Sequence, residues 1–225
     1  MRRNRSPNDI QFAGSKIKIT MAKNFAAIAF TDAVKAMQEK LGSRSSYARM
    51  ERAFIDGLTE NEINFIAQRD SFYIATIGEN KFPYLQHRGG PKGFLRVLDA
   101  RRIGLIDFRG NRQYISVGNI TANNNVALIM VDYPAKTRLK ILAKAEIVEL
   151  KDDPSLYGLL AVEDYQFKPE RMMIFNVEAY DWNCQQHITP RYNLEEIREV
   201  FMAQQDHIEK LEAEVKEMKL KLRDT

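Results

Sequence analysis

Disulfides, membrane-spanning segments and repeats are all missing from this chain of 225 residues. A single cysteine, Cys184, excludes an internal disulfide framework and favours a reducing compartment. No apolar run approaches the ~20 residues that cross a bilayer. The run at residues 25–30 is also shorter than the core of a secretory signal peptide. We therefore expect a cytoplasmic protein with no membrane association.

Outside the first residues, the chain has almost no excess of positive or negative charge. The formal net charge is +4, yet residues 1–23 hold six Lys or Arg against Asp9 alone. The remaining 28 basic and 29 acidic residues nearly cancel. The basic excess therefore belongs to a polar arm, residues 1–24, which we expect to be flexible. No interleaving of basic and aromatic residues supports a nucleic-acid partner.

Helical spacing follows over residues 25–70. Thr31 is a suitable cap for a helix that Gly42 ends, and Tyr47 begins a second apolar repeat that runs to Gly57. A capping-box pattern, Thr59-x-x-Glu62, precedes a third helix. We expect these helices to pack on the domain that follows.

From Ser71 the apolar period becomes that of β-strands. A helix from Asn111 to Asn119 is predicted between the third and fourth strands, and a short helix over residues 154–162. Residues 78–81 and 133–136 have the composition of hairpin turns. Six strands with short connections predict a mainly β (α+β) fold, a β-barrel over residues 71–192, rather than a parallel α/β sheet. The predicted strands are 72–77, 82–87, 103–107, 126–132, 138–149 and 172–182.

The last segment, residues 193–225, has a stricter apolar repeat than a helix packed on its own domain requires. Its seam residues follow alternating steps of three and four, with Gln204 as the one polar member. This spacing predicts a coiled-coil helix, and an intramolecular helix is the alternative. The seam consists of Leu194, Ile197, Phe201, Gln204, Ile208, Leu211, Val215, Met218 and Leu222.

Two segments of the predicted barrel are rich in polar residues and glycine. Residues 86–94 place Gln86, His87 and Arg88 at a strand end, ahead of three glycines in five residues. Such a backbone can approach a flat ligand closely, with hydrogen-bond donors beside it. A plain turn is the alternative reading of the same residues.

The second segment, residues 107–114, is a predicted strand-to-helix turn. Asn111 is predicted to cap the helix, and Arg109 and Arg112 lie beside it. Free N–H groups at a helix start favour a phosphate when guanidinium groups are near. With Arg138 and Lys140 on a later strand, the sequence indicates a site for a phosphate monoester, although solvated loop arginines would look the same.

In their order, these strings resemble the FMN-binding split barrel of the pyridoxamine 5′-phosphate oxidase family. The resemblance covers about residues 30–191. Within the family, the chain is most similar to bacterial oxidase-related flavoproteins. The strings are Gln-His-Arg-Gly-Gly-Pro at 86–91, Asp-Phe-Arg-Gly-Asn-Arg-Gln-Tyr at 107–114 and Trp-Asn-Cys-Gln-Gln-His-Ile-Thr-Pro-Arg at 182–191.

The resemblance implies a homodimer with FMN at the subunit interface. It implies that the strand of residues 86–88 runs beside the flavin ring. The family's usual Ser-Arg-Lys is Asn-Arg-Gln at residues 111–113, so one cation that binds the phosphate is missing. The resemblance implies that Arg109 or Arg138 replaces it. The implied cofactor residues are Gln86, His87, Arg88, Asp107, Phe108, Arg109, Asn111, Arg112, Gln113, Arg138 and Lys140, with Trp182, Gln186, His187 and Arg191 supplied by the partner subunit.

The implied function is that of an FMN-dependent oxidoreductase, moving two electrons to or from a small substrate. NADH or NADPH is a candidate reductant. His87 and Arg88 are the candidate catalytic residues, as proton donor or as stabiliser of the reduced flavin. The segment that holds pyridoxal phosphate in true oxidases is replaced here by the heptad helix, so pyridoxamine phosphate oxidation is not the expected reaction.

Three alternatives stay open at this point. A split barrel of this kind can hold haem or a deazaflavin in place of FMN. The chain can also be a non-catalytic flavin-binding or assembly module, with the coiled coil as its working part and a route to higher oligomers. A metal site is not expected, because Cys184 and His187 offer two ligands where structural zinc needs four.

Overall fold

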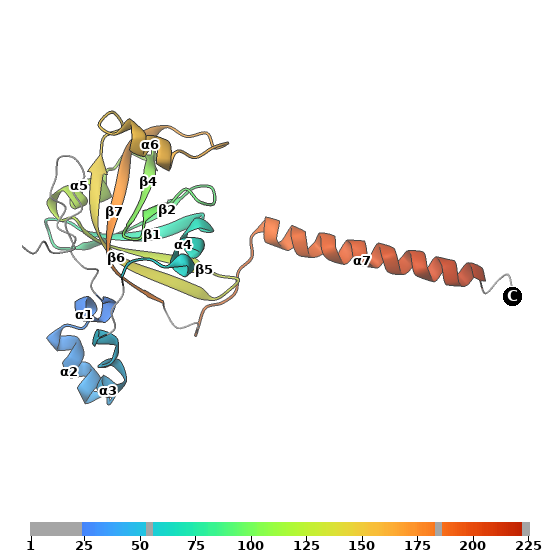
Figure 1. Cartoon of the computed structure of the whole chain (residues 1–225), viewed down its shortest axis with the longest axis horizontal. Helices are drawn as coiled ribbons and strands as arrows, with labels where there is room; N and C mark the ends of the chain where they lie inside the picture. The colour runs from blue at the N-terminus through green and yellow to red at the C-terminus, as the bar shows by residue number, and fades with distance from the viewer. Residues whose placement is uncertain (1–23, 53–55, 183–185, 222–225) are drawn as a thin grey trace, which may run out of the picture.

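A curled antiparallel sheet forms the body of the molecule, with small helices at one end and one long helix extending from it (Figure 1). The computed structural model describes residues 24–52, 56–182 and 186–221. The predicted basic arm, apart from Asn24, and Cys184 lie outside these ranges. None of the helices in the described part of the chain combines the length and apolar character that a bilayer crossing needs.

The N-terminal helices begin at the expected capping residues. Thr31 accepts a hydrogen bond at its hydroxyl from the backbone N–H of Val34, 3.4 Å away. The capping box at Thr59 and Glu62 is formed. The helix predicted from Tyr47 is wrong: a short helix ends at Tyr47, and a separate 3-10 turn follows at Met50–Arg52, where the Met50 carbonyl accepts a hydrogen bond from the Asn24 side chain. The elements are α1 (Phe25–Ala29), α2 (Asp32–Lys40), α3 (Arg44–Tyr47), η1 (Met50–Arg52) and α4 (Glu60–Ala67).

The sheet has seven antiparallel strands in the order β2-β1-β5-β6-β7-β4-β3. All six predicted strands are present, and both predicted hairpin turns are formed. The additional strand, β3, has four residues, and its two apolar residues, Val97 and Leu98, are adjacent, so it gives no period-2 signal. The strands are β1 (Ser71–Ile77), β2 (Pro83–Gly89), β3 (Arg96–Asp99), β4 (Arg102–Phe108), β5 (Asn125–Asp132), β6 (Thr137–Val148) and β7 (Pro169–Trp182).

The sheet curls so that β2 approaches β4, although the two strands are not neighbours in it. Arg88 on β2 forms an ion pair with Asp107 on β4 across this gap. The result is a split β-barrel. Alternate side chains of each strand fill its interior, among them Phe72, Ile74, Leu128, Ile141 and Phe175.

A second, smaller core covers the outside of β4. Here α6 (Pro154–Leu160) places the buried Leu160 against Ile106 and Ile174. A Cβ at Gly104 would stand 2.7 Å from Ile174 Cδ1 and 3.2 Å from Leu160 Cδ2, so the glycine permits this close packing. Strand β4 is therefore buried on both faces, which fixes its position.

The helix after β4 begins later than predicted. It is α5 (Ile115–Ala122), and its N-cap is Tyr114 in the left-handed conformation, with φ of 55°. Asn111 does not cap it, and that prediction is wrong. Its side-chain oxygen instead accepts from the backbone N–H of Gln113 at 3.2 Å, because asparagine readily closes a turn two residues on.

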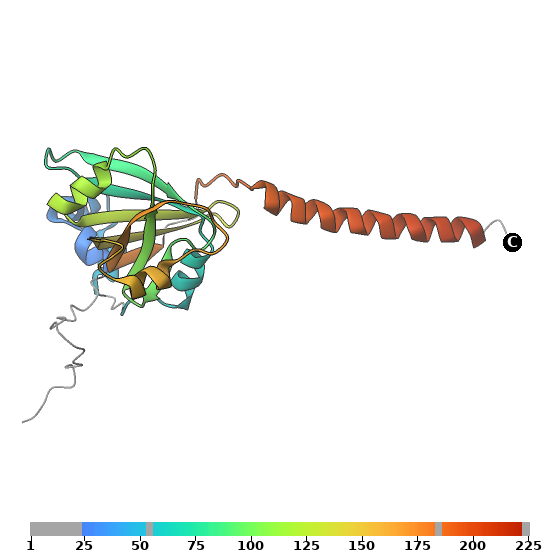
Figure 2. The same cartoon turned by 90° about the horizontal axis from the view of Figure 1, so that it is seen from above.

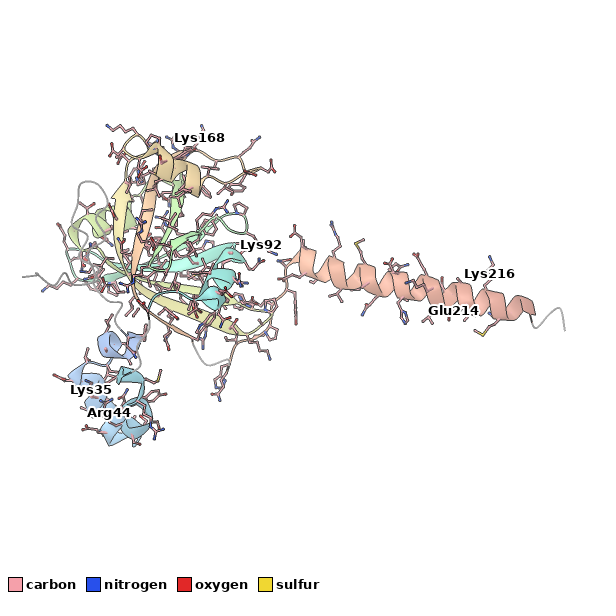
Figure 3. The ribbon with its side chains drawn as sticks, viewed as in Figure 1. Lys35, Arg44, Lys92, Lys168, Glu214 and Lys216 are labelled. Atoms are coloured by element: carbon pink, nitrogen blue, oxygen red, sulfur yellow. The ribbon has the colours of Figure 1, made fainter. Side chains whose placement is uncertain are left out.

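The long C-terminal helix α7 (Leu194–Lys221) extends away from the barrel (Figures 1 and 2). Asn193 and Glu196 cap its start reciprocally, through N–H···O bonds of 2.8 and 2.9 Å. None of the other helices and strands that the structure describes packs along it. Figure 3 shows its side chains, Glu214 and Lys216 among them, projecting away from the helix.

Candidate functional site

A cavity of about 230 Å³ opens where β2 and β4 approach each other. Its wall is formed by the inner face of β2, the end of β4, the loop of residues 110–114, the first turn of α5 and the start of β7. The strand pairing places polar side chains there. Gln86 and Arg88 lie opposite Ile74 and Phe72, whose side chains point into the barrel. Asp107 points inward by the same alternation along β4.

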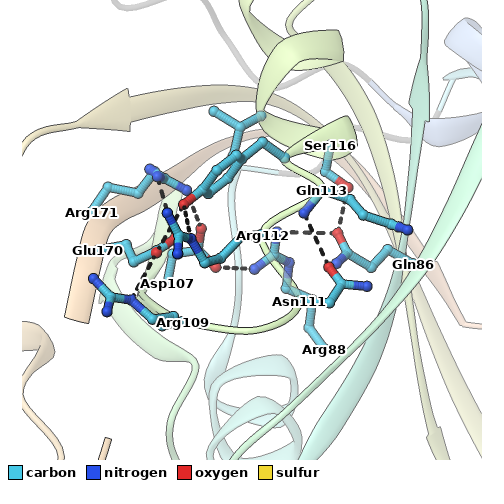
Figure 4. A network of polar contacts seen from close by, with 12 residues as sticks. Gln86, Arg88, Asp107, Arg109, Asn111, Arg112, Gln113, Ser116, Glu170 and Arg171 are labelled. Carbon is cyan, nitrogen blue, oxygen red and sulfur yellow. Dashed lines mark hydrogen bonds and ion pairs between the residues drawn. The ribbon is translucent and has the colours of Figure 1, made fainter. Parts of the chain in front are cut away.

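Asp107 is the buried centre of the first polar cluster (Figure 4). One carboxylate oxygen pairs with Arg88, and the other accepts from Arg171 Nη1 at 2.9 Å. The three side chains are 6%, 11% and 15% exposed. Each cation on its own would be costly to bury, and the shared carboxylate offsets that cost.

Glu170 is the centre of the second cluster. Its Oε1 accepts from Arg109 Nε and from the Tyr114 hydroxyl, both at 3.1 Å, and its Oε2 lies 3.4 Å from Arg171 Nη2. Arg112 Nε lies 3.4 Å from the Tyr114 hydroxyl. Arg171 therefore joins the two clusters, and Tyr114 connects the helix start to both.

Gln86 ties the wall of β2 to helix α5. Its side-chain oxygen accepts from Ser116 Oγ at 2.5 Å and from Arg88 Nη2 at 3.2 Å. Ser116 is almost fully buried. In the described part of the chain, the buried Arg88 Nε has no hydrogen-bond partner. The Arg88 guanidinium is thus oriented from two sides and keeps one donor unused.

The cavity wall has an excess of positive charge. Three arginines line it, Arg88, Arg112 and Arg171, against two carboxylates. Arg112 and Tyr114 both have left-handed backbone, with φ of 65° and 55°. For residues with a Cβ this conformation costs about 1–2 kcal/mol each, and such strain often accompanies functional sites. The wall can hold an anion with several charge-assisted hydrogen bonds.

The glycines after β2 have a packing role. A Cβ at Gly90 would stand 2.7 Å from Phe94 Cγ and 3.0 Å from the Phe108 ring. Gly93 has φ of +78°, which glycine adopts without strain. These contacts explain two of the three glycines without a flat ligand.

His87 lies on the opposite face of β2 from the cavity. Its ring contacts Tyr73 edge-on, with centroids 5.3 Å apart. The cross-strand row continues through Ile129 to Lys140, whose amine lies 3.0 Å from Asp181. Within one chain, the two candidate catalytic residues His87 and Arg88 therefore face different sides of the sheet.

The remaining predicted residues also lie away from the cavity within one chain. Arg138 is half-buried on β6, opposite Val131 of β5. Gln186 and His187 form an exposed turn, and the Arg191 guanidinium lies 5.0 Å from the centre of the Tyr133 ring. No group of three metal-ligating side chains occurs among the described residues.

Trp182, which is 38% exposed, takes part in a separate cluster around the buried Glu62. Its indole N–H donates to Glu62 Oε1 at 2.5 Å, and its ring packs on Phe65. Burial raises the pKa of Glu62, but hydrogen bonds from Thr59 and Trp182 outweigh it and leave the pKa below its usual value. Burial and the nearby carboxylate raise the pKa of Tyr180 to about 12. The cluster anchors α4 to the end of β7.

Sequence reasoning missed five polar residues of the cavity wall. Tyr84 could have been found, because it lies two positions before Gln86 on the same strand face. The other four depend on contacts distant in sequence, such as the pairing of Asp107 with Arg171 across β4 and β7. They are Tyr114, Ser116, Glu170 and Arg171.

The fold and this cavity define a split-barrel protein with a cationic pocket between its approaching strands. A family model described as pyridoxamine 5′-phosphate oxidase matches residues 58–179. The chain belongs to this family. Among the curated proteins, no relative matches it.

Several solved structures are similar to this chain. A proposed pyridoxamine 5′-phosphate oxidase from Lactobacillus delbrueckii is 25% identical, with a TM-score of 0.43, over 56% of this chain and 93% of that one. A Clostridium acetobutylicum protein related to general stress protein 26 is 16% identical, with a TM-score of 0.42, over 61% and 94%. An FMN-binding protein from Syntrophomonas wolfei is 11% identical, with a TM-score of 0.42, over 66% and 97%.

Proposed function

We propose that this chain is an FMN-binding oxidoreductase that acts on a small substrate. The observation that carries the proposal is the cavity between β2 and β4, in which three arginines face two carboxylates. A phosphate monoester is a dianion near neutral pH and matches this excess of positive charge. Membership of the pyridoxamine 5′-phosphate oxidase family supports a flavin as the bearer of that phosphate.

The residues present fit a phosphate group. Arg112 lies on an exposed loop at the cavity and can turn its guanidinium toward a ligand. Arg88 has a buried N–H without a partner among the described residues. Gln113 replaces a family lysine, and Arg109 lies next to the same loop, held by Glu170. We assign phosphate binding to Arg112, assisted by Arg88 and Arg109.

When bound, a flavin accepts and donates two electrons, which the amino-acid side chains cannot do. The residues of the chain bind and orient it. Ser116 and Arg88 hold Gln86 in place on the wall of β2, so its amide is available in a fixed orientation. Phe108 supplies an apolar surface at the cavity edge. His87 lies on the outer face of the same strand, away from the cavity, so we assign it proton donation only to a group that a partner subunit brings to that face.

We further propose a homodimer formed through that outer face. The apolar side chains of β1, β2 and their hairpin are exposed there, and burying them in a second copy would be favourable. A second chain on this face would also enclose His87 and could supply Trp182, Gln186, His187 and Arg191. The exposed side chains are Tyr73, Ile77, Phe82 and Leu85, at 45%, 41%, 74% and 68%.

The test is a comparison of FMN with riboflavin, which lacks the phosphate. Quenching of flavin fluorescence on binding measures the two affinities. We expect wild-type protein to bind FMN roughly 10- to 100-fold more tightly than riboflavin, which is the contribution of one hydrogen bond to a charged group. Arg112→Ala should lose most of this preference. Arg102→Ala is the matched control, because Arg102 lies at the other end of β4 and pairs with Asp99 on the surface.

Each outcome decides the proposal. Equal affinity for FMN and riboflavin, or no binding of either, would refute the phosphate assignment. If the visible spectrum of the purified protein shows bound haem or a deazaflavin, that group, and not FMN, is the cofactor. A bound flavin that neither NADH nor NADPH reduces, with no turnover of added acceptors, would support the non-catalytic binding module instead.

A further inference from the structure

The seam of α7 is an apolar stripe that no other described part of the chain covers. Its described apolar members are between 40% and 82% exposed. None of the other described helices and strands packs along this helix. Most helical stability in proteins comes from packing of an apolar face, so we expect a partner to cover this seam.

Heptad positions follow from the spacing of the seam. With Leu194 at position a, the β-branched Ile208 and Val215 fall at a, and Leu211 falls at d. β-Branched residues at a with leucine at d favour two parallel strands over larger bundles. The C-terminal half of the seam therefore favours a single partner helix of the same kind, whereas Leu194 at a and Ile197 at d, in the first turns, follow the pattern of larger bundles.

Gln204 decides the orientation. It occupies position d, and in a parallel in-register pair it faces the partner's Gln204, with which its amide can exchange hydrogen bonds. In an antiparallel pair a d residue faces an a residue, and every a residue of this seam is apolar. A buried amide without a partner costs about 1–3 kcal/mol, so parallel pairing is favoured.

Charged residues beside the seam agree with this orientation. Glu214 at g faces Lys219 of the partner subunit at e, and His207 at g faces Glu212 of the partner subunit at e. The contact of Glu214 with the partner's Lys219 joins opposite charges, and the contact of His207 with the partner's Glu212 is not repulsive. Each contact occurs twice in a symmetric pair. All four side chains are exposed in one chain and free to make these contacts.

We infer that α7 pairs with α7 of a second copy as a parallel, in-register, two-stranded coiled coil. The paired helices span about 42 Å at a rise of 1.5 Å per residue. The inference rests on α7 alone and does not depend on the flavin. Its partner is another copy of this chain rather than a different protein.

Disulfide trapping tests the pairing in the full-length chain. Cys184→Ser removes the single native thiol. In that background Leu211→Cys places identical d positions opposite each other in a parallel pair, within disulfide range. Ala213→Cys is the matched control, because it lies two residues away on the outer side of the coil. We expect a covalent dimer with Leu211→Cys and not with Ala213→Cys.

Three results would overturn the inference: no covalent dimer with Leu211→Cys, equal crosslinking of both variants, or crosslinking only when Ile208→Cys and Leu211→Cys chains are mixed. The last of these results indicates antiparallel pairing.

A charge exchange gives a second readout. Adding Glu214→Lys to the Leu211→Cys chain should lower the crosslinked fraction in a thiol buffer, and adding Lys219→Glu as well should restore it. Far-UV circular dichroism and FMN binding check that the barrel is unchanged.

Discussion

The buried carboxylate of Asp107 offers the sharpest test of how the barrel is held closed. Asp107→Asn keeps the size of the side chain and removes its charge. It leaves Arg88 and Arg171, at 11% and 15% exposure, facing a neutral amide that cannot serve both as the carboxylate does. Breaking a buried ion pair by removing one partner costs about 3–5 kcal/mol.

The structure places the expected cost at the lower end of that range. Arg171 keeps Glu170 at 3.4 Å, and Arg88 keeps the oxygen of Gln86 at 3.2 Å. We therefore expect Asp107→Asn to lower the free energy of unfolding by about 3 kcal/mol. With a urea m-value of about 2 kcal/mol/M, the unfolding midpoint falls by about 1.5 M.

Urea unfolding followed by Trp182 fluorescence and far-UV circular dichroism measures this shift. Asp99→Asn is the control, because Asp99 pairs with Arg102 on the surface, where their side chains are 45% and 53% exposed. Its cost should be about 1 kcal/mol or less. The reasoning fails if Asp107→Asn lowers the midpoint no further than Asp99→Asn, with m unchanged in both.

Three further predictions concern other parts of the barrel. Gly57→Ala should lower the free energy of unfolding by more than about 1 kcal/mol, because φ is +88° and the new Cβ meets the Ala100 carbonyl oxygen at 2.5 Å. Its control is Gly118→Ala on the open face of α5, which should raise the free energy of unfolding by about 0.5–1 kcal/mol, as thermal unfolding of the two variants measures. Leu160→Ala should cost about 2–5 kcal/mol by opening a cavity in the small core, and a urea midpoint equal to wild type would contradict that core. The pKa of Glu62 is lowered in the folded state, so its ionised carboxylate stabilises the fold above the unfolded-state pKa, and this stability is lost as pH falls through the folded-state pKa. Between about pH 6 and pH 3, Glu62→Gln should therefore lose less free energy of unfolding than wild type. Equal losses in the two proteins would show that Glu62 does not contribute to the acid sensitivity.

The strands were predictable because their period is local. In β1 the buried Phe72, Ile74 and Thr76 alternate with more exposed residues, and this pattern marks one barrel wall without knowledge of its neighbours. The helix start at Thr31 and the capping box at Thr59 were equally local. Turn chemistry was less decisive, because Asn111 could cap a helix or close a turn, and the chain uses it for the turn.

The candidate site was only half predictable. Gln86, Arg88 and Arg112 stand in distinctive strings, and the structure brings them to one cavity. Sequence adjacency also grouped His87 with them, yet the alternation of β2 sends His87 to the other face. Glu170 had no local signal, because its role depends on the register of β7 against β4.

The sequence by itself determined the period of each strand, the helix capping residues, the heptad seam of α7 and membership of a recognisable family, since all of these are patterns among near neighbours along the chain. Tertiary structure decided which charges meet. Asp107 and Arg171 lie far apart in sequence and become partners only through the register of two strands. The curl of the sheet then adds Arg88, because a carboxylate buried between approaching strands is stable only with cations beside it.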